Sequence, residues 1–180
     1  MEYYNKNIQI SKNVILDILE NIKIQKTAKM LVFGLGYDSN LWYYGNNKNT
    51  YFVENNEKYI ELNKDIPETN IIKYDYKNIN VKNSLLLNDK DINNYLLPQK
   101  LLDLLPFDII LIDGPEGYMS SKPGRLLPCF WSYKYLSKKD TLIYIDDSNR
   151  ILESYCINKY FKDKIVNIFP ERNKCCKIIL

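Results

Sequence analysis

The chain has 180 residues, of which 46% are apolar and 26% charged, and its formal net charge is +3. This composition is typical of one globular domain and excludes an intrinsically disordered chain, while so small a charge does not by itself indicate nucleic-acid binding. The first residues, MEYYNKN, lack the apolar core of a signal peptide, and no apolar run is long enough to span a membrane, so we expect a cytoplasmic protein without a membrane partner.

The N-terminal segment, residues 1–25, is expected to form a helix that packs on a single domain spanning residues 1–180. Ser11 is a suitable N-cap, and apolar side chains recur after it at the spacing of a helix. This stripe should be buried, and it consists of Val14, Ile15, Ile18, Leu19 and Ile22.

Strand and helix patterns then alternate along the chain. Short apolar, β-branched or aromatic runs predict strands at 30–33, 50–54, 70–74, 107–112, 141–145, 165–169 and 175–180. The stretches with helical spacing are 39–44, 55–63, 126–136 and 150–161. In the third of these helices the side chains expected to pack are Leu127, Phe130, Trp131 and Tyr135. Residues 80–105 have a weaker pattern, because 85–87 could extend a strand or fill a loop and 89–105 is helical with a break at Pro98.

The alternation of strands and helices, ending in two consecutive strands, predicts an α/β fold. Its centre is a mostly parallel seven-stranded sheet with right-handed crossovers, helices on both faces and a C-terminal antiparallel hairpin. The hairpin favours a Rossmann-like class I methyltransferase domain over a dinucleotide-binding domain. The four cysteines contain no CxxC pair, so we expect free thiols and no zinc site, with Cys175 and Cys176 on opposite faces of the last strand.

Ligands of an open α/β sheet bind outside the carboxyl ends of its strands, so the residues that follow each predicted strand are candidates for a site. Gly34 and Gly36 follow the first strand and let the backbone bend tightly near a ligand. Ser39 occupies the third position of the dinucleotide-binding glycine motif, which argues against that motif. Glu54 closes the second strand, where a carboxylate can accept hydrogen bonds from both ribose hydroxyls of a nicotinamide dinucleotide or of S-adenosylmethionine. The alternatives are a tight turn without a ligand and an acid that stabilises a helix N-terminus.

Three aspartates follow two other predicted strands: Asp113, Asp146 and Asp147. Adjacent strands lie about 5 Å apart, so these carboxylates would repel one another unless something positive is bound. A hard divalent cation such as Mg²⁺ suits oxygen ligands and can lower the pKa of a bound hydroxyl, which matters in a chain without histidine. The alternative is that one aspartate caps the following helix and another is solvated.

The Gly/Pro-rich loop 115–125, PEGYMSSKPGR, should lie beside these aspartates. Such loops often carry substrate-binding residues on a rigid scaffold. Glu116 is a candidate base or a hydrogen-bond acceptor for substrate, and Tyr118 could stack on a sugar face. Arg125 could hold a carboxylate or phosphate of the acceptor. The alternative is a surface turn.

Five segments, taken in order, resemble a known family. They are LVFGLGYDSNLW (31–42), FVENNEKY (52–59), IDGPEGY (112–118), PGR (123–125) and IDDSNR (145–150). Over roughly residues 25–180 the chain resembles the polysaccharide-biosynthesis family that includes the plant glucuronoxylan 4-O-methyltransferases. The resemblance implies a class I methyltransferase fold, S-adenosylmethionine as cofactor and a sugar hydroxyl as acceptor.

The resemblance also implies roles for individual residues. The candidate cofactor-binding residues are Phe33, Gly34, Leu35, Gly36, Asp38, Ser39, Glu54 and Asp113. Asp147 and Arg150 match the family's His-Asp-x-x-Arg segment, and Asp146 stands where the family has histidine. This Asp-Asp pair looks like that of metal-dependent sugar O-methyltransferases in macrolide biosynthesis, so we expect a cytoplasmic sugar as acceptor, either nucleotide-activated or part of a glycan under construction.

We therefore predict an S-adenosylmethionine-dependent O-methyltransferase that methylates a sugar hydroxyl, assisted by a divalent cation. The catalytic candidates are Asp113, Asp147 and, as reserve base, Glu116; the metal candidates are Asp113, Asp146 and Asp147; the acceptor-binding candidates are Tyr118, Arg125 and Arg150. The alternatives are an NAD(P)-dependent oxidoreductase and a non-catalytic nucleotide-binding module. An RNA methyltransferase ranks lower because the chain has no strongly basic stripe, and a homodimer stays open.

Overall fold

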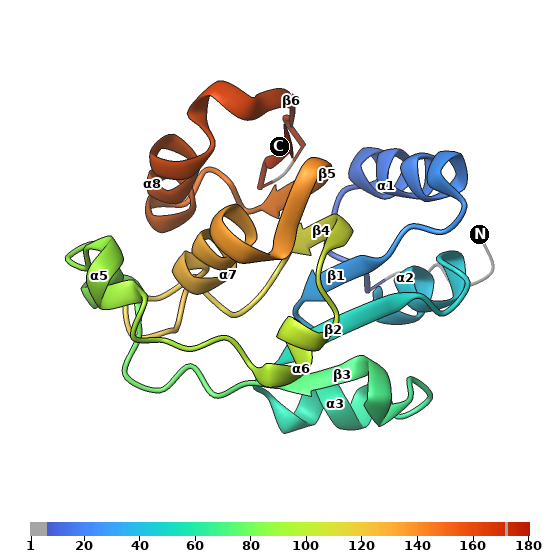
Figure 1. Cartoon of the computed structure of the whole chain (residues 1–180), viewed down its shortest axis with the longest axis horizontal. Helices are drawn as coiled ribbons and strands as arrows, with labels where there is room; N and C mark the ends of the chain where they lie inside the picture. The colour runs from blue at the N-terminus through green and yellow to red at the C-terminus, as the bar shows by residue number, and fades with distance from the viewer. Residues whose placement is uncertain (1–6, 172) are drawn as a thin grey trace.

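The computed structural model describes residues 7–171 and 173–180, so the first six residues of the predicted N-terminal segment lie outside the described part. A seven-stranded sheet in the order β3-β2-β1-β4-β5-β7-β6 runs through the centre of the molecule (Figure 1). The strands are β1 Met30–Phe33, β2 Thr50–Glu54, β3 Ile71–Lys73, β4 Phe107–Ile112, β5 Ser137–Asp146, β6 Ile165–Phe169 and β7 Cys175–Ile179.

The direction of the strands confirms the predicted sheet. The strands β1 to β5 pair in parallel, whereas β7 lies antiparallel between β5 and β6. Parallel strands place their carboxyl ends at one edge of the sheet. The loops that follow β1, β2, β4 and β5 therefore meet at that edge.

Helices cover both faces of the sheet (Figure 1). They are α1 Lys12–Gln25, α2 Ser39–Gly45, α3 Glu57–Leu62, α4 Val81–Ser84, α5 Asp89–Ile92, α6 Gln99–Asp103, α7 Leu126–Trp131 and α8 Ile151–Tyr160, with short 3₁₀ turns at Glu68–Asn70 and Lys162–Lys164. Ser11 caps α1 as predicted, because its Oγ accepts a hydrogen bond from the Val14 amide at 3.3 Å. Among the described residues, no helix combines the length and the apolar character that crossing a membrane requires.

Two hydrophobic clusters lie on opposite faces of the sheet. Side chains alternate along a strand, and β1 accordingly directs Leu31 and Phe33 into one cluster and Met30 and Val32 into the other. The first cluster lies under α5 to α8, and the second lies under α1 and α2. The adjacent thiols of the last strand also separate as predicted, and all four cysteines are free and buried.

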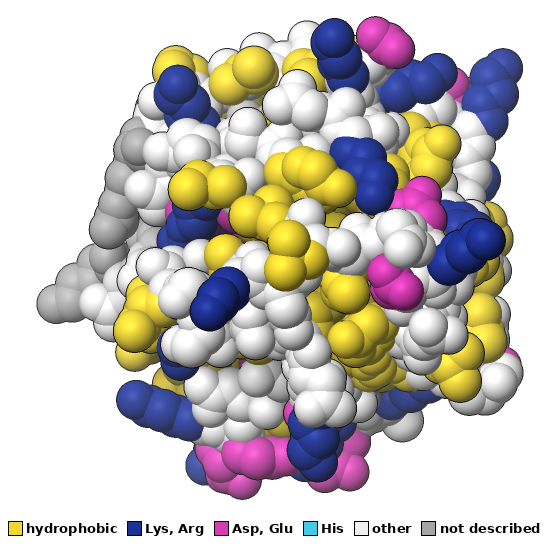
Figure 2. Space-filling model, turned by 90° about the vertical axis from the view of Figure 1, so that its left-hand side faces the viewer, with side chains coloured by type: hydrophobic (Ala, Val, Ile, Leu, Met, Phe, Trp, Pro, Cys, Tyr) yellow, Lys and Arg dark blue, Asp and Glu magenta, His cyan; other side chains and the backbone are white. Residues whose placement is uncertain are grey.

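The segment 80–105 differs from its sequence pattern. The predicted break at Pro98 is confirmed, since α5 ends before it and α6 begins after it, but these two helices are much shorter than the expected stretch 89–105. Residues 85–87 form a turn and not a strand. In this irregular segment the side chain of Leu86 is 82% exposed. The face of the molecule that carries α5 and α8 has exposed hydrophobic side chains near its middle (Figure 2).

The predicted helix 126–136 is present but changes its winding. After α7 the chain continues as a π-helical turn over Ser132–Leu136. Tyr135 was expected to pack inside and is 38% exposed, which corrects that prediction. Its hydroxyl donates a hydrogen bond to Asn93 Oδ1 at 2.9 Å, so the wider turn carries the ring to the surface of the 80–105 segment.

Candidate functional site

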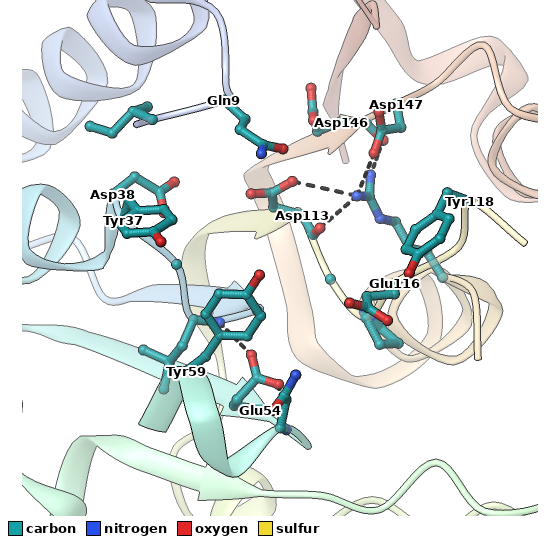
Figure 3. Close-up of a pocket in the computed structure, with 18 of the residues that line it drawn as sticks. Gln9, Tyr37, Asp38, Glu54, Tyr59, Asp113, Glu116, Tyr118, Asp146 and Asp147 are labelled. Carbon is teal, nitrogen blue, oxygen red and sulfur yellow. Dashed lines mark hydrogen bonds and ion pairs between the residues drawn. The ribbon is translucent and has the colours of Figure 1, made fainter. Parts of the chain in front are cut away.

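The carboxyl edge of the sheet holds a pocket of about 320 Å³ (Figure 3). The loops after β1, β2, β4 and β5 line it, joined by residues 7–9 and by Asn173. This size suits a small molecule, and the position is the one expected for ligands of an open α/β sheet.

Two glycines let the first and fourth strand-end loops touch. Gly34 has a φ of +109°, a conformation that side chains with a Cβ rarely adopt. A Cβ added to Gly114 would lie 2.8 Å from the Gly34 Cα, closer than any real contact. The two backbones therefore pack directly on each other and form the floor between the two ends of the pocket.

Glu54 lies 6% exposed at one end of the pocket. Its Oε2 accepts a hydrogen bond from the Leu35 amide at 2.7 Å, and its Oε1 accepts from the Asn55 and Asn56 amides, also at 2.7 Å. Burial raises the pKa of this carboxyl, and the three backbone donors oppose that rise. Oε2 keeps a second lone pair, so the fixed group can still accept a ribose hydroxyl.

The glycine loop is held from within by short polar side chains. Ser39 Oγ accepts a hydrogen bond from the Gly36 amide at 2.8 Å, and Asp38 Oδ2 accepts from the Trp42 indole at 2.7 Å. Burial, reinforced by the charge of Asp113, raises the pKa of Asp38 to about 7. A buried carboxyl facing the pocket in this way would be stabilised by a cationic ligand.

Not every predicted cofactor residue lines the pocket. Leu35 and the two glycines of the loop do, whereas Phe33 and Ser39 are absent from its wall. The Phe33 ring packs in the core against Trp131, and its carbonyl oxygen accepts from the Asp113 amide at 3.1 Å. In the structure Phe33 and Ser39 lie behind the loop, and their predicted part in cofactor binding stays a prediction.

The three predicted aspartates come together at the other end of the pocket. Oxygen atoms of Asp113, Asp146 and Asp147 all lie within 4.8 Å of one another. Burial, together with the charge of Asp113, raises the pKa of Asp146 to about 7. Asp147 has a φ of +54° and is nearly buried, and its Oδ1 has no hydrogen-bond partner among the described residues.

Arg125 is the centre of this acidic group and is 3% exposed. Its Nη2 donates to the main-chain oxygen of Asp113 at 2.5 Å and to Asp147 Oδ2 at 2.7 Å, and its Nη1 donates to the main-chain oxygen of Asp146. Arg150 Nη1 lies 2.8 Å from the same Asp147 oxygen. The guanidinium of Arg125 thus joins the ends of β4 and β5. Arg125 also lines the pocket, and its predicted contact with the acceptor stays a prediction.

The donor set fits a hard divalent cation. Three carboxylates share one space, and Asp147 Oδ1 has no hydrogen-bond partner among the described residues. Burial and then the charge of Asp113 raise the pKa of Asp146, and a bound cation would oppose both effects. Arg125 would compete with a cation for Asp113, because its Nη2 lies 3.4 Å from Asp113 Oδ1. Oxygen ligands for a cation remain on all three aspartates.

The loop 115–125 forms the outer wall of this end (Figure 3). Glu116, the residue predicted as reserve base, has a half-exposed side chain. Its Oε2 lies 2.5 Å from Lys122 Nζ, so it already forms an ion pair. Tyr118 is 59% exposed at the mouth, and Lys122 lies 5.4 Å from the centre of its ring. The predicted acceptor residue Arg150 lines the pocket beside them.

The sequence reasoning missed several residues that line the pocket. Tyr37 comes from the glycine loop and Tyr59 from α3. Both belong to the segments that carry the family resemblance, and this membership could have identified them as candidates. Gln9 reaches the pocket from the N-terminal segment, and its side chain points toward Asp113 and Asp146 (Figure 3). No local pattern marks Gln9, because only the packing of α1 brings it to the site.

Glu153 on α8 is a further residue that the sequence did not single out. It is fully buried, and neither of its carboxylate oxygens has a hydrogen-bond partner among the described residues. Burial raises its pKa, while Arg125 and Arg150 oppose that rise. Its position three residues after Arg150 places both on one side of the helix, so Glu153 adds negative charge behind the two arginines.

No family model matches the chain. Arabinogalactan O-methyltransferase 2 of Arabidopsis thaliana is 27% identical over 184 residues, which cover 88% of this chain and 61% of that protein. Glucuronoxylan 4-O-methyltransferase 1 of the same species is 25% identical over 178 residues, covering 84% of this chain and 62% of that protein. The chain thus spans about three fifths of the length of these relatives.

Solved structures share the fold at lower identity. An O-methyltransferase from Bacillus cereus in complex with SAH has a TM-score of 0.54 at 16% identity, covering 96% of this chain and 83% of that one. An SAH-bound methyltransferase from Podospora anserina has a TM-score of 0.55 at 13% identity, covering 95% and 79%. The family resemblance and the fold class are confirmed: the chain has the class I O-methyltransferase fold and is similar in sequence to plant polysaccharide O-methyltransferases.

Proposed function

We propose that the chain is an S-adenosylmethionine-dependent O-methyltransferase that methylates a hydroxyl of a sugar. One observation carries this proposal: a single pocket has the glycine loop and Glu54 at one end and three aspartates at the other. The first end suits the adenosine part of the cofactor, and the second suits the hydroxyl that receives the methyl group. The names of both plant relatives refer to a polysaccharide, which supports a sugar acceptor.

The glycine loop and Glu54 would hold the nucleoside. Glu54 is oriented by backbone donors before any ligand arrives, so little reorganisation is needed for its Oε2 to accept a ribose hydroxyl. Gly34 and Gly114 have no side chains, and their backbones touch. The cofactor could therefore extend over this contact from one end of the pocket to the other. Asp38 lies beside this path and can stabilise the positive charge of the cofactor.

The acidic end would orient the acceptor and take its proton. The sulfonium of the cofactor supplies an electrophilic methyl group, so the chain has to align the hydroxyl and remove its proton. Without a bound cation, Asp146, whose pKa is about 7, can accept a proton near neutral pH. Asp113, Asp146 and Asp147 would hold a divalent cation, which when bound lowers the pKa of the acceptor hydroxyl.

Calorimetry with SAH and, in parallel, with NAD tests the cofactor. We expect binding of SAH and none of NAD, and the reverse result would make the chain an oxidoreductase. Transfer of a labelled methyl group to sugars, with Mg²⁺ or with a chelator, tests the activity and the cation. SAH binding without transfer to any acceptor would favour a non-catalytic binding module.

The substitution Asp147→Ala separates the two ends of the pocket. We expect turnover to fall by about 10²-fold or more while SAH affinity changes by less than about tenfold, because Asp147 lies at the acidic end. The measurements are kcat and the calorimetric Kd. An equal loss of both would mean that Asp147 supports the cofactor end or the fold.

A further inference from the structure

A buried acid behind the aspartate end, Glu153 of α8, has no part in the function proposed above. Its side chain is fully buried, and neither carboxylate oxygen has a hydrogen-bond partner among the described residues. A buried carboxylate without a partner destabilises a fold unless positive charge nearby compensates for it. The groups around Glu153 indicate what its charge compensates.

The loop 115–125 lies between Glu153 and the pocket. A Cβ added to Gly117 would lie 2.9 Å from Glu153 Oε1 and 3.8 Å from Arg150 Nη1, so the carboxylate lies against the backbone of the loop, near this guanidinium group. Glu153 is absent from the pocket wall, whereas Arg125 and Arg150 line it. Glu153 is therefore not placed to bind a cation in the pocket directly.

Arg125 connects Glu153 to the aspartates. The Nη atoms of Arg125 donate to Asp147 and to main-chain oxygens at the ends of β4 and β5, whereas its Nε is buried and has no hydrogen-bond partner in the described part of the chain. Burial raises the pKa of Glu153, and the charges of Arg125 and Arg150 oppose that rise. The two arginines thus interact with the aspartates on the pocket side and with Glu153 behind it.

A divalent cation would change the balance of charge at this end. The cation and the two guanidinium groups carry four positive charges, against three negative charges from Asp113, Asp146 and Asp147. The ion pair of Glu116 with Lys122 adds no net charge. Because both guanidinium groups stay close to the aspartates, they repel the cation, and a negative charge behind them weakens this repulsion.

We propose that Glu153 is a positioning residue of the cation site, whose negative charge offsets the two arginines and strengthens binding of a divalent cation that it does not touch. This inference rests on the proposed function, in which three aspartates hold the cation. Without the cation, the charge of Glu153 adds to an excess of acid and lowers stability. With the cation bound, the same charge completes the balance, so the two states respond oppositely to its loss.

Two variants separate the charge of Glu153 from its shape. Glu153→Gln keeps the shape and removes the charge, whereas Glu153→Asp keeps the charge and shortens the side chain. The probe is Mn²⁺, added to the full chain with and without SAH at about pH 8, where the carboxylates are mostly charged. Calorimetry and the EPR signal of free Mn²⁺ give the Kd. We expect the Kd to rise by about five- to tenfold in Glu153→Gln and by less than about threefold in Glu153→Asp.

Thermal melts of the same variants give a second readout. With a chelator, Glu153→Gln should melt no lower than the wild type, and Mn²⁺ should raise its Tm by less than it raises that of the wild type. Glu153→Asp should melt lower in both conditions, because the shorter side chain leaves a buried cavity. Glu57→Gln, which changes an exposed acid of α3, is the control and should change neither the Kd nor the Tm.

An unchanged Kd in Glu153→Gln would overturn the proposal. So would failure of this variant to fold, or a loss of stability with the chelator as large as that of Glu153→Asp, since Glu153 would then serve the packing of α8 alone. If SAH binds the wild type but Mn²⁺ does not, this inference fails while the methyltransferase assignment stands. If Mn²⁺ binds with the expected changes but SAH does not, the role of Glu153 stands and the proposed cofactor is wrong.

Discussion

The two ends of the pocket hold their carboxylates in opposite ways. At one end Glu54 accepts three hydrogen bonds from backbone amides of the neighbouring loops. At the other end Asp147 is held by the guanidinium groups of Arg125 and Arg150, and one of its oxygens has no hydrogen-bond partner in the described part of the chain. The first arrangement is complete without a ligand, and the second is not.

This difference shows which end should respond to charge. Backbone donors fix a carboxylate without a second ionic group, so the Glu54 end is ready for neutral ribose hydroxyls. The aspartate end concentrates charge that two arginines neutralise only in part, with the buried Glu153 behind them. We therefore expect substitutions, pH and cations to act more strongly on the aspartate end.

The largest effect on stability is expected for Arg125→Ala. Removing this guanidinium leaves the buried Asp147 without its closest partner, and breaking a buried ion pair in this way costs about 3–5 kcal/mol of unfolding free energy. Chemical denaturation measures the change. Arg150→Ala is the matched control, since Arg150 is more exposed and should cost about 1 kcal/mol. Similar losses in both variants would show that Arg125 does not join the two strand ends.

Glu54→Gln should have a smaller effect on stability and a clear one on SAH binding. The amide group places an N–H donor opposite a backbone N–H, which costs about 1–3 kcal/mol of unfolding free energy. SAH affinity should fall by about tenfold or more, because the ribose loses a charged acceptor. The control is Glu57→Gln, an exposed acid of α3, which should leave the calorimetric Kd unchanged.

Lowering the pH from about 8 to about 6 should stabilise the protein by about 1–3 kcal/mol, measured with a chelator present. Asp38 and Asp146 have a pKa of about 7 in the folded chain and 3.8 as the ordinary value. Between pH 3.8 and about pH 7 the folded state therefore binds more protons than the unfolded state. The free energy of unfolding falls as the pH rises through this range, and the whole loss is present above about pH 7. Asp146→Asn should make the free energy of unfolding depend less on pH. An unchanged slope would show that Asp146 does not have a raised pKa.

The smallest effect is expected for Lys122→Gln. The pair that Lys122 forms with Glu116 is partly exposed to solvent, and such pairs contribute less than about 1 kcal/mol to stability. A thermal melt should shift little. A large loss of stability would mean that the ion pair of the outer wall stabilises the fold as the buried pair of Arg125 does. The expected difference between the two pairs would then be wrong.

Much of the sheet follows from local pattern. Strands β1, β2, β4 and β6 begin and end at the predicted residues. For β1, β2 and β4 the reason is a continuous apolar run that is buried in the sheet, whereas β6 is a mostly exposed edge strand. The segment 80–105 could not be predicted in this way. Its short helices are set by caps such as Asn88 and by packing on the sheet, and these override weak helical spacing.

The sequence by itself determined the fold class and the edge of the sheet where chemistry collects, since glycines and acids stand directly after apolar strands. Only the tertiary structure decided what each of these residues contacts. Arg125 joins two strand ends because β4 and β5 bring two main-chain oxygens and Asp147 to it from 12 to 22 positions away in the chain. Gln9 lines the pocket for the same physical reason: burial and contact across the fold depend on packing between distant segments, which no local spacing encodes.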